Sequence, residues 1–172
     1  MPSFRTTRRV RHSAADMFDL VADVEKYPLF LPLCTGLKVR SRTQDAQGRD
    51  TLTADMTVGY KAVRETFTSR VTLDRPAQEI HVVYIDGPFS RLDNRWSFRD
   101  LESSNGRPAC EVGFFIDYEF RNRMLGILMG SMFETAFRRF AEAFEARADL
   151  VFGRRALAAP SAPPAPSAPP SP

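Results

Sequence analysis

The chain has 172 residues, of which 43% are hydrophobic and 26% charged, which suits one domain with a core and a short additional segment. Arg154 and Arg155 supply two of the three net positive charges, so residues 1–153 are nearly neutral. This balance argues against DNA binding. Two cysteines are too few for a disulfide framework and favour a reducing compartment.

We expect neither a targeting segment nor a membrane-spanning segment in this sequence. The first eleven residues are rich in arginine and have no apolar run, so we expect no secretory signal. No run of about 18 apolar residues is present to cross a bilayer. We therefore expect a cytoplasmic protein, in part peripheral at the inner face of the membrane.

The first elements are a strand and two small helices. Residues 4–10 are expected to form the strand. Ser13 and Asp16 have the spacing of a capping box, which predicts a helix through Val21. Asp23 can cap a second, very short helix that Pro28 interrupts. The loop that follows, residues 27–34, is rich in large apolar side chains but contains two prolines, so it is neither a regular helix nor a central strand.

From Gly36 to Phe120, apolar and polar residues alternate with a period of two, which predicts six strands. Short turns rich in glycine and proline separate them, so neighbouring strands form antiparallel hairpins. Strands of this length coil and give the sheet a concave face. The expected strands cover residues 37–40, 51–58, 63–73, 80–85, 92–99 and 110–120.

Residues 122–148 predict one long helix, because apolar side chains recur every three or four residues. Leucine and methionine dominate its first half and phenylalanine its second half. Thioethers adapt to irregular space. We therefore expect the Leu125–Met132 half to cover an apolar cavity and the Phe133–Phe144 half to pack in a closed core. An ordinary core helix along its whole length is the alternative.

These elements predict an α+β fold in residues 1–153, with the long helix across the concave face of an antiparallel sheet. Residues 154–172 are expected to be a disordered tail, because beyond Arg155 only alanine, proline, serine and one leucine occur.

Catalytic constellations are scarce in the sequence. His12 and His81 have no cysteine or carboxylate at metal-ligand spacing, and nothing near Cys34 would activate a thiolate. Glu65 shares an apolar strand face with Phe67, where it would pair with an inward arginine or bind the polar head of a ligand. We predict a protein that is not an enzyme and that holds no metal or cofactor.

Several motifs resemble the ubiquinone-binding branch of the START-like, or helix-grip, superfamily. They are Asp23-Val-Glu-x-Tyr-Pro-x-Phe-Leu-Pro-x-Cys34, Asp86-Gly-Pro-Phe89, Trp96-x-Phe98 and Asp117-Tyr-Glu-Phe-Arg-Asn122 before the long helix. This branch includes mitochondrial coenzyme-Q-binding proteins and bacterial ribosome-association toxins. The similarity runs from about residue 2 to residue 150. Leu33 departs from the pattern, since mitochondrial members often carry tryptophan there.

The resemblance implies a seven-stranded antiparallel sheet around the C-terminal helix, with an apolar tunnel between them. It implies non-catalytic binding of ubiquinone or a similar isoprenoid lipid, as a carrier or chaperone that supports respiration. The alternative is a regulator that binds the large ribosomal subunit and blocks subunit association, with Arg5, Arg8, Arg9 and Arg11 as a basic edge. A polyketide-cyclase-like enzyme would lack an acid/base set beyond Glu65.

The candidate ligand site combines the apolar loop, inward strand positions and the long helix. The loop is either the tunnel entrance, in transient contact with a membrane surface, or a plug on the core. The candidate ligand-binding residues are Phe30, Leu31, Leu33, Met56, Val58, Glu65, Phe67, Phe89, Trp96, Leu125, Leu128, Met129, Met132 and Phe133.

Overall fold

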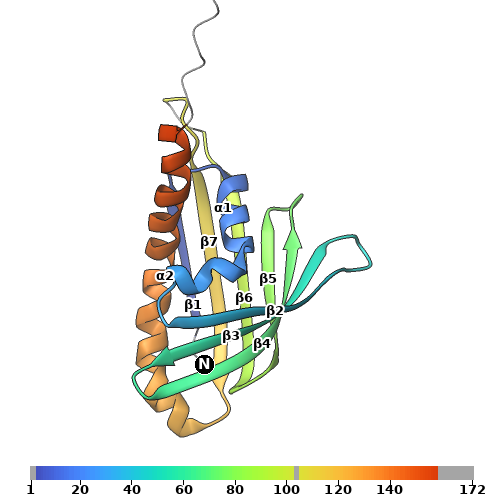
Figure 1. Ribbon diagram of the computed structural model, residues 1–172, viewed down its shortest axis with the longest axis vertical. Coiled ribbons are helices and arrows are strands. Elements are labelled where there is room, and N and C mark those ends of the chain that lie inside the picture. Colours follow the sequence, from blue (N-terminus) through green and yellow to red (C-terminus); the bar gives the residue numbers. More distant parts are fainter. Residues whose placement is uncertain (1–2, 103–104, 159–172) are drawn as a thin grey trace, which may run out of the picture.

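Seven antiparallel strands form one sheet in the computed structural model, which describes residues 3–102 and 105–158 (Figure 1). The spatial order of the strands is β1-β7-β6-β5-β4-β3-β2, so every sheet neighbour except the β1–β7 pair is joined by a hairpin. The strands are β1 (Ser3–Val10), β2 (Cys34–Gln44), β3 (Asp50–Tyr60), β4 (Val63–Asp74), β5 (Glu79–Asp86), β6 (Phe89–Asp100) and β7 (Cys110–Phe120). The predicted α+β fold is confirmed.

The alternation of the sequence sets which face of each strand is buried. In β4, Phe67, Ser69 and Val71 are buried on the concave face, whereas Arg64 and Arg70 are exposed on the other face. Because side chains alternate in a strand, a one-residue slip in pairing would exchange these two sets. The register therefore follows from the hydrophobic pattern.

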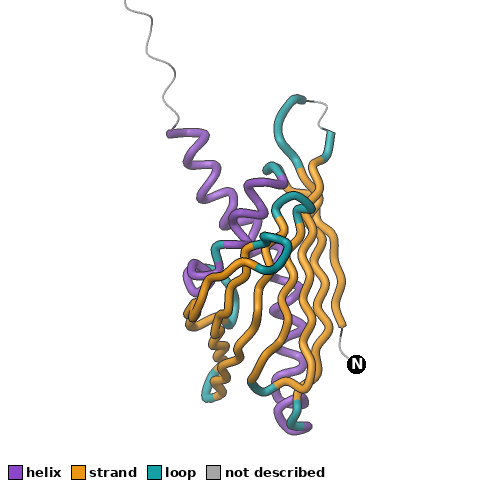
Figure 2. Tube along the Cα trace, turned by 90° about the vertical axis from the view of Figure 1, so that its right-hand side faces the viewer, coloured by secondary structure: helices purple, strands orange, loops and turns teal. Residues whose placement is uncertain are grey.

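The sheet is strongly coiled. β2, β3 and β4 cross β1, β6 and β7 at a steep angle, and the two groups enclose a concave face (Figures 1 and 2). Register shifts occur in β2, between Thr68 and Ser69 of β4, and near Phe89 of β6. Such bulges increase the local twist, and here they let long strands wrap around a helix.

Gly87 allows the β5–β6 turn to lie against β4. Its φ is +141°, and a Cβ atom at this position would lie 2.6 Å from the Cβ and 2.9 Å from the Cα of Phe67. Only glycine fits both this backbone conformation and this approach. The next buried residue, Phe89, stacks on Phe120 at 4.7 Å and meets Phe67 edge-on at 5.4 Å. The Asp86-Gly-Pro-Phe89 motif thus anchors an aromatic cluster.

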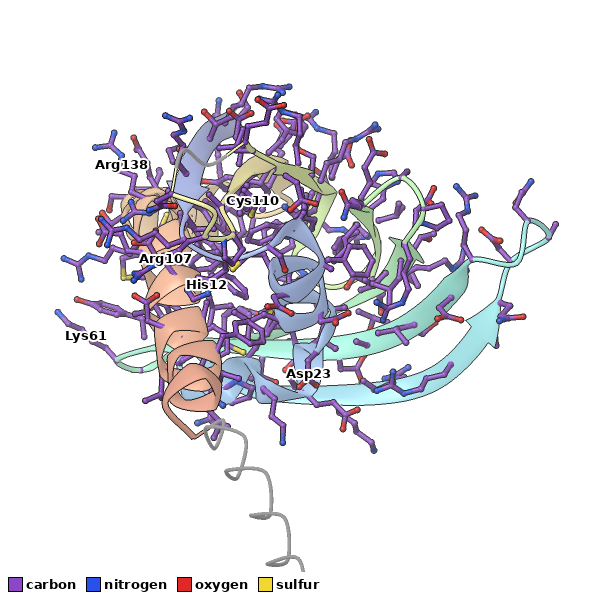
Figure 3. All side chains as sticks on the ribbon, turned by 90° about the horizontal axis from the view of Figure 1, so that it is seen from above. His12, Asp23, Lys61, Arg107, Cys110 and Arg138 are labelled. Carbon is purple, nitrogen blue, oxygen red and sulfur yellow. The ribbon has the colours of Figure 1, made fainter. Side chains whose placement is uncertain are left out.

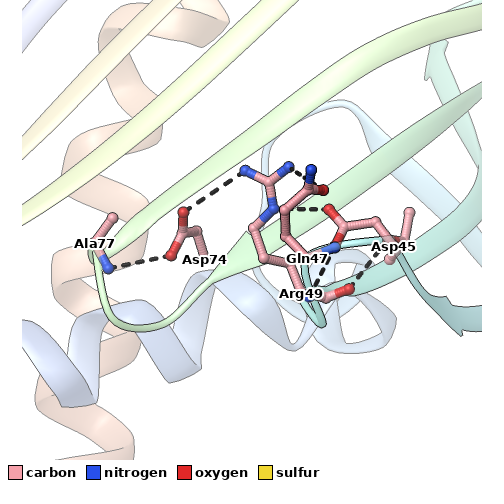
Figure 4. A network of polar contacts seen from close by, with 6 residues as sticks. Asp45, Gln47, Arg49, Asp74 and Ala77 are labelled. Atoms are coloured by element: carbon pink, nitrogen blue, oxygen red, sulfur yellow. Dashed lines mark hydrogen bonds and ion pairs between the residues drawn. The ribbon is translucent and has the colours of Figure 1, made fainter.

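Two turns at one edge of the sheet are joined by Arg49 (Figure 4). In the β2–β3 turn, the backbone N–H and the Nε of Arg49 both donate to the carboxylate of Asp45, which holds the pKa of Asp45 below its usual range. Arg49 also lies 3.8 Å from the carboxylate of Asp74, which accepts from the backbone N–H of Ala77. The network connects the β2–β3 hairpin to the β4–β5 hairpin.

The two small helices follow β1 as predicted. α1 (Ala14–Ala22) is capped by Ser13, whose hydroxyl accepts from the backbone N–H of Asp16 at 3.1 Å. The 3₁₀ helix η1 (Val24–Leu29) includes Pro28. Together they lead the chain to the loop between η1 and β2, which lies beside the long helix (Figure 1).

The long helix α2 (Arg123–Ala158) has 36 residues and runs along the concave face. The Asn122 side chain caps its start by accepting from the backbone N–H of Met124 at 2.8 Å. The Arg8–Glu145 ion pair at 2.9 Å and the contact of His12 Nε2 with the Asp149 carboxylate at 2.7 Å connect it to the β1 side of the sheet.

The end of α2 lies ten residues beyond the expected Ala148. The apolar spacing continues at Val151 and Phe152, and the Phe152 ring packs against His12 at 5.7 Å, so the helix remains in contact with the domain past the predicted end. The predicted domain end at residue 153 and the disordered tail stay predictions, since residues 159–172 lie outside the described residues.

Candidate functional site: an apolar cavity under the long helix

An apolar cavity lies between the concave face of the sheet and the middle of α2. Its floor comes from β2 to β7, and one side from η1 and the loop that follows it. The lining residues are Val24, Tyr27, Leu31, Pro32, Leu33, Cys34, Leu37, Ala54, Met56, Val58, Phe67, Ser69, Val71, Ile80, Val82, Phe89, Leu92, Asn94, Trp96, Phe114, Ile116, Phe133, Phe137, Phe140 and Phe144. Hydrocarbon and aromatic rings therefore surround nearly all of the free space.

Aromatic rings form the contact between α2 and the sheet. Trp96 of β6 lies 5.0 Å from Phe144 and 4.7 Å from Phe114, centroid to centroid. Phe137 of α2 lies 5.3 Å from Tyr118 of β7. These edge-on arrangements are favourable for rings and fix the helix above the cavity. Side chains project from α2 and from the curved strands into the space between them (Figure 3).

The apolar loop after η1 closes the cavity on one side. Leu33 has a φ of +67°, and its carbonyl accepts from the backbone N–H of Gly59 at 2.9 Å. A left-handed conformation is costly for leucine, so the β3 contact holds a strained backbone in place. Leu31, Pro32 and Leu33 line the cavity, while neighbouring Leu29 is 66% exposed.

Eight of the predicted site residues line the cavity, which brings the loop, the strands and α2 together at one place. They are Leu31, Leu33, Met56, Val58, Phe67, Phe89, Trp96 and Phe133. That these residues bind a ligand stays a prediction.

Six predicted residues lie outside the lining. Phe30 packs behind it, 5.1 Å from the Phe144 ring. Glu65 shares the face of Phe67 but lies nearer the first residue of β4, outside the lining. It has no ion-pair partner within the described residues. The other four, Leu125, Leu128, Met129 and Met132, belong to the first turns of α2.

The expectation that the Leu125–Met132 half of α2 covers the cavity is wrong, and the Phe133–Phe144 half lines the cavity as well as packing in the core. Phe133, Phe137, Phe140 and Phe144 face the cavity, whereas the leucine and methionine half lies beyond its end. Met129 is 1% exposed in a closed contact. The reason is the position of α2 along the sheet: residues 123–132 contribute no side chain to the cavity lining, whereas residues between 133 and 144 do.

The first turns of α2 expose large apolar side chains. Met124, Ile127 and Leu128 are 67%, 75% and 59% exposed, and Arg121 and Arg123 are also exposed beside them. The β3–β4 turn, which carries Lys61, reaches past α2 at the same end of the molecule (Figures 1 and 3). We call Met124, Ile127 and Leu128 the apolar tip.

Sequence reasoning missed most of the cavity floor. Ser69 and Val71 follow Phe67 at every second position of β4, so alternation alone was a sufficient signal. The same holds for Leu92 and Asn94 before Trp96. The phenylalanines of α2 carried the signal of a buried stripe, which does not distinguish a core from a cavity wall.

The polar groups of the cavity are mostly engaged. The Tyr27 hydroxyl donates to the Val21 carbonyl, and the Cys34 thiol donates to the Gly36 carbonyl at 3.6 Å. Burial raises the pKa of both groups, to about 11 for Cys34. Both are therefore neutral near pH 7, and a neutral thiol is a poor nucleophile.

The free space in the cavity is about 100 Å³. Ligand sites for drug-sized molecules occupy about 300–1,000 Å³, so a ligand of that size has to displace side chains or the loop. Among residues 3–102 and 105–158, no group of three or more histidine, cysteine or acidic side chains is placed to hold a metal ion. Within the same ranges, no helix is long and apolar enough to span a bilayer.

This arrangement, a coiled antiparallel sheet closed by a C-terminal helix over an apolar cavity, defines a helix-grip protein. Residues 10–145 match the family described as polyketide cyclase / dehydrase and lipid transport. The chain belongs to this START-like family. It matches a START superfamily protein from Mycobacterium smegmatis with a TM-score of 0.69 and 21% identity, over 87% of this chain and 98% of that one.

Two kinds of relative have similar sequences. The ribosome association toxin RatA of Escherichia coli K12 is 34% identical over 155 residues, which are 90% of this chain and 92% of the relative. The mitochondrial coenzyme Q-binding protein COQ10 homolog B of Xenopus laevis is 30% identical over 145 residues, 83% of this chain and 56% of the relative. The predicted resemblance to the branch that contains both is confirmed.

Enzymes share this fold as well. The ZhuI aromatase/cyclase of Streptomyces sp. R1128 matches with a TM-score of 0.65 and 18% identity, over 92% of this chain and 97% of that one. Identity this low shows the fold alone. The names of the two relatives above denote no enzyme.

Proposed function

We propose that this protein binds ubiquinone or a similar isoprenoid lipid in the cavity and acts as a non-catalytic carrier in support of respiration. The observation that carries the proposal is the lining itself, in which aromatic and aliphatic side chains surround a space between α2 and the sheet. Apolar surface without a catalytic acid, base or thiolate suits binding and not chemistry. The name of the coenzyme Q-binding relative supports the same ligand class.

Binding requires the cavity to widen. Each methylene moved from water into the cavity contributes about 0.8 kcal/mol, but a lipid starts from a membrane that already shelters its tail. Displacement of Phe140 or of the loop at Leu33 opposes binding further. We therefore expect moderate affinity and ready exchange, as a carrier needs.

The apolar tip is the surface that we assign to membrane contact. Met124, Ile127 and Leu128 would enter the interface, and Arg121 and Arg123 beside them would face anionic headgroups. The tip lies at one end of the helix whose middle covers the cavity. A bilayer at this position would bring a lipid close to its binding site.

Trp96 provides the test. It is the only tryptophan, it is 5% exposed, and it lines the cavity. Titration with a short-chain ubiquinone should quench its fluorescence with saturation, whereas free N-acetyltryptophanamide should show only linear collisional quenching. Linear quenching of the protein up to the solubility limit would refute binding beside Trp96.

The second candidate is a ribosome-binding regulator, as the name of the RatA relative suggests. Of the predicted basic edge, Arg8 is paired with Glu145 and Arg5 lies over the Phe115 ring at 4.6 Å, while Arg9 and Arg11 are exposed. Contacts with RNA phosphates weaken steeply with salt. Co-sedimentation with large ribosomal subunits that falls sharply between low and moderate salt would support this candidate, and no co-sedimentation at low salt would refute it.

A further inference from the structure

Two polar side chains interrupt the apolar floor of the cavity. Ser69 of β4 is 6% exposed and Asn94 of β6 is 8% exposed, and both line the cavity. Buried polar groups normally have hydrogen-bond partners, so any capacity that remains unused here points toward a ligand.

The Ser69 hydroxyl makes no hydrogen bond to any residue of 3–102 or 105–158. Its neighbours on the same face of β4, Phe67 and Val71, offer it no polar partner. A valine or alanine would fill this position of an apolar floor without that cost. The hydroxyl therefore faces the cavity with its donor and its acceptor both free.

Asn94 is held in one orientation and keeps one donor free. Its Oδ1 accepts from Trp96 Nε1 at 3.1 Å, and its Nδ2 donates to the Phe115 carbonyl at 2.8 Å. The indole is only a donor and the carbonyl only an acceptor, so the amide cannot be flipped. The second N–H of Nδ2 has no partner within the described residues.

The strand register places Ser69 and Asn94 on either side of β5, at a separation that suits a small ring-shaped ligand group. Ser69 pairs with Tyr84 of β5, and Asn94 pairs with Val82, two residues before Tyr84 on the same strand. At about 4.8 Å between strands and 3.3 Å per residue, their Cα atoms are about 12 Å apart. Both side chains point into the same concave space, so a ring with an oxygen at each end fits between them.

We propose that Ser69 and Asn94 form the polar end of the site and bind the two carbonyl oxygens of a quinone headgroup. This inference rests on the proposed function and adds the position of the headgroup and the class of ligand. The Asn94 N–H can only donate, so it favours an oxygen acceptor, whereas Ser69 can donate to a carbonyl or accept from a hydroxyl. The isoprenoid tail would then extend toward Leu31 and Leu33.

Ser69→Ala tests the inference, with Ser97→Ala on the exposed face of β6 as the matched control. Calorimetry would measure the Kd of a ubiquinone with two isoprene units and of farnesene, an isoprenoid without oxygen. Loss of one hydrogen bond should raise the quinone Kd of Ser69→Ala about three- to tenfold, with farnesene changed less than twofold. An unchanged quinone Kd, or equal losses for both ligands, would overturn the inference.

A second measurement needs no variant. Hydrogen bonds lower the carbonyl stretching frequency of a quinone, so infrared difference spectra of the wild-type complex should show both carbonyl bands below their positions in hexane. Bands at the hexane positions would overturn the inference and leave the proposed function intact. Wild-type protein that binds no quinone would overturn both.

Discussion

Met129 and Phe140 lie on the same helix but in different environments, and replacing each by alanine should separate them. Met129 is 1% exposed and lies outside the cavity lining, whereas Phe140 is half-buried and borders the cavity. Truncation of a fully packed methionine leaves a new void. Truncation of a cavity-lining ring enlarges a space that exists already.

The expected losses in the free energy of unfolding follow from this difference. Met129→Ala should lower the free energy of unfolding by about 2–5 kcal/mol, the range for buried methionine. Phe140→Ala should cost less than about 2 kcal/mol, below the usual cost of about 3–5 kcal/mol for a fully packed phenylalanine. At about 2–4 °C per kcal/mol for a chain of this size, the melting temperatures of the variants should differ visibly.

Urea unfolding of both variants, followed by circular dichroism, measures the two free energies. Phe140→Ala should also bind a short-chain ubiquinone at least as tightly as wild type, because the ring no longer has to move aside. A loss of stability at Phe140 equal to that at Met129 would contradict the reasoning and would mean that α2 is packed uniformly along its length.

Three further changes address the fold, the buried thiols and the apolar tip. Gly87→Ala should strongly lower the free energy of unfolding, because its Cβ would lie 2.9 Å from the Phe67 backbone. Gly48 has a φ of +80° but open space around it, so Gly48→Ala should lower that free energy by only about 1 kcal/mol in urea unfolding. Burial raises the pKa of Cys34 to about 11 and of Cys110 to about 12. The folded state therefore keeps protons that unfolded thiols lose near about pH 8.5. The free energy of unfolding should fall as pH rises from about 9 toward about 11, and it should fall less steeply in Cys110→Ala. An equally steep fall in that variant would contradict the thiol assignment. Ile127→Glu should reduce co-sedimentation with anionic vesicles several-fold while leaving the melting temperature unchanged. Thr135→Glu, on the polar face of α2, is the control. Equal vesicle binding by the two variants would exclude the apolar tip as the membrane-contact surface.

The sequence was a good guide to the elements and a partial guide to the site. Alternation in a strand such as β4 indicates which side chains face inward, and the capping box of Ser13 and Asp16 indicates where α1 starts. These signals are local. The antiparallel order of the strands and the position of α2 over the concave face followed from short turns and from the long apolar stripe.

The roles of the two halves of α2 could not be read in this way. A buried helical stripe looks the same whether it faces a closed core or a cavity, because both require apolar side chains. Which half of α2 lines the cavity depends on the position of the helix along the sheet. That position is set by contacts between residues distant in sequence, such as Arg8 with Glu145 and Phe89 with Phe133. The sequence did not predict Ser69 and Asn94 as site residues, because single polar residues are common in strands.

The most direct test of the account is the lipid content of the purified protein. Full-length protein from quinone-producing cells, extracted with organic solvent and analysed by chromatography and mass spectrometry, should yield an isoprenoid quinone in clear excess over an unrelated protein purified in the same way. Extracts with no quinone above that background, from protein whose cavity also fails to take up added quinone, would contradict the claim that the space under α2 is a quinone site.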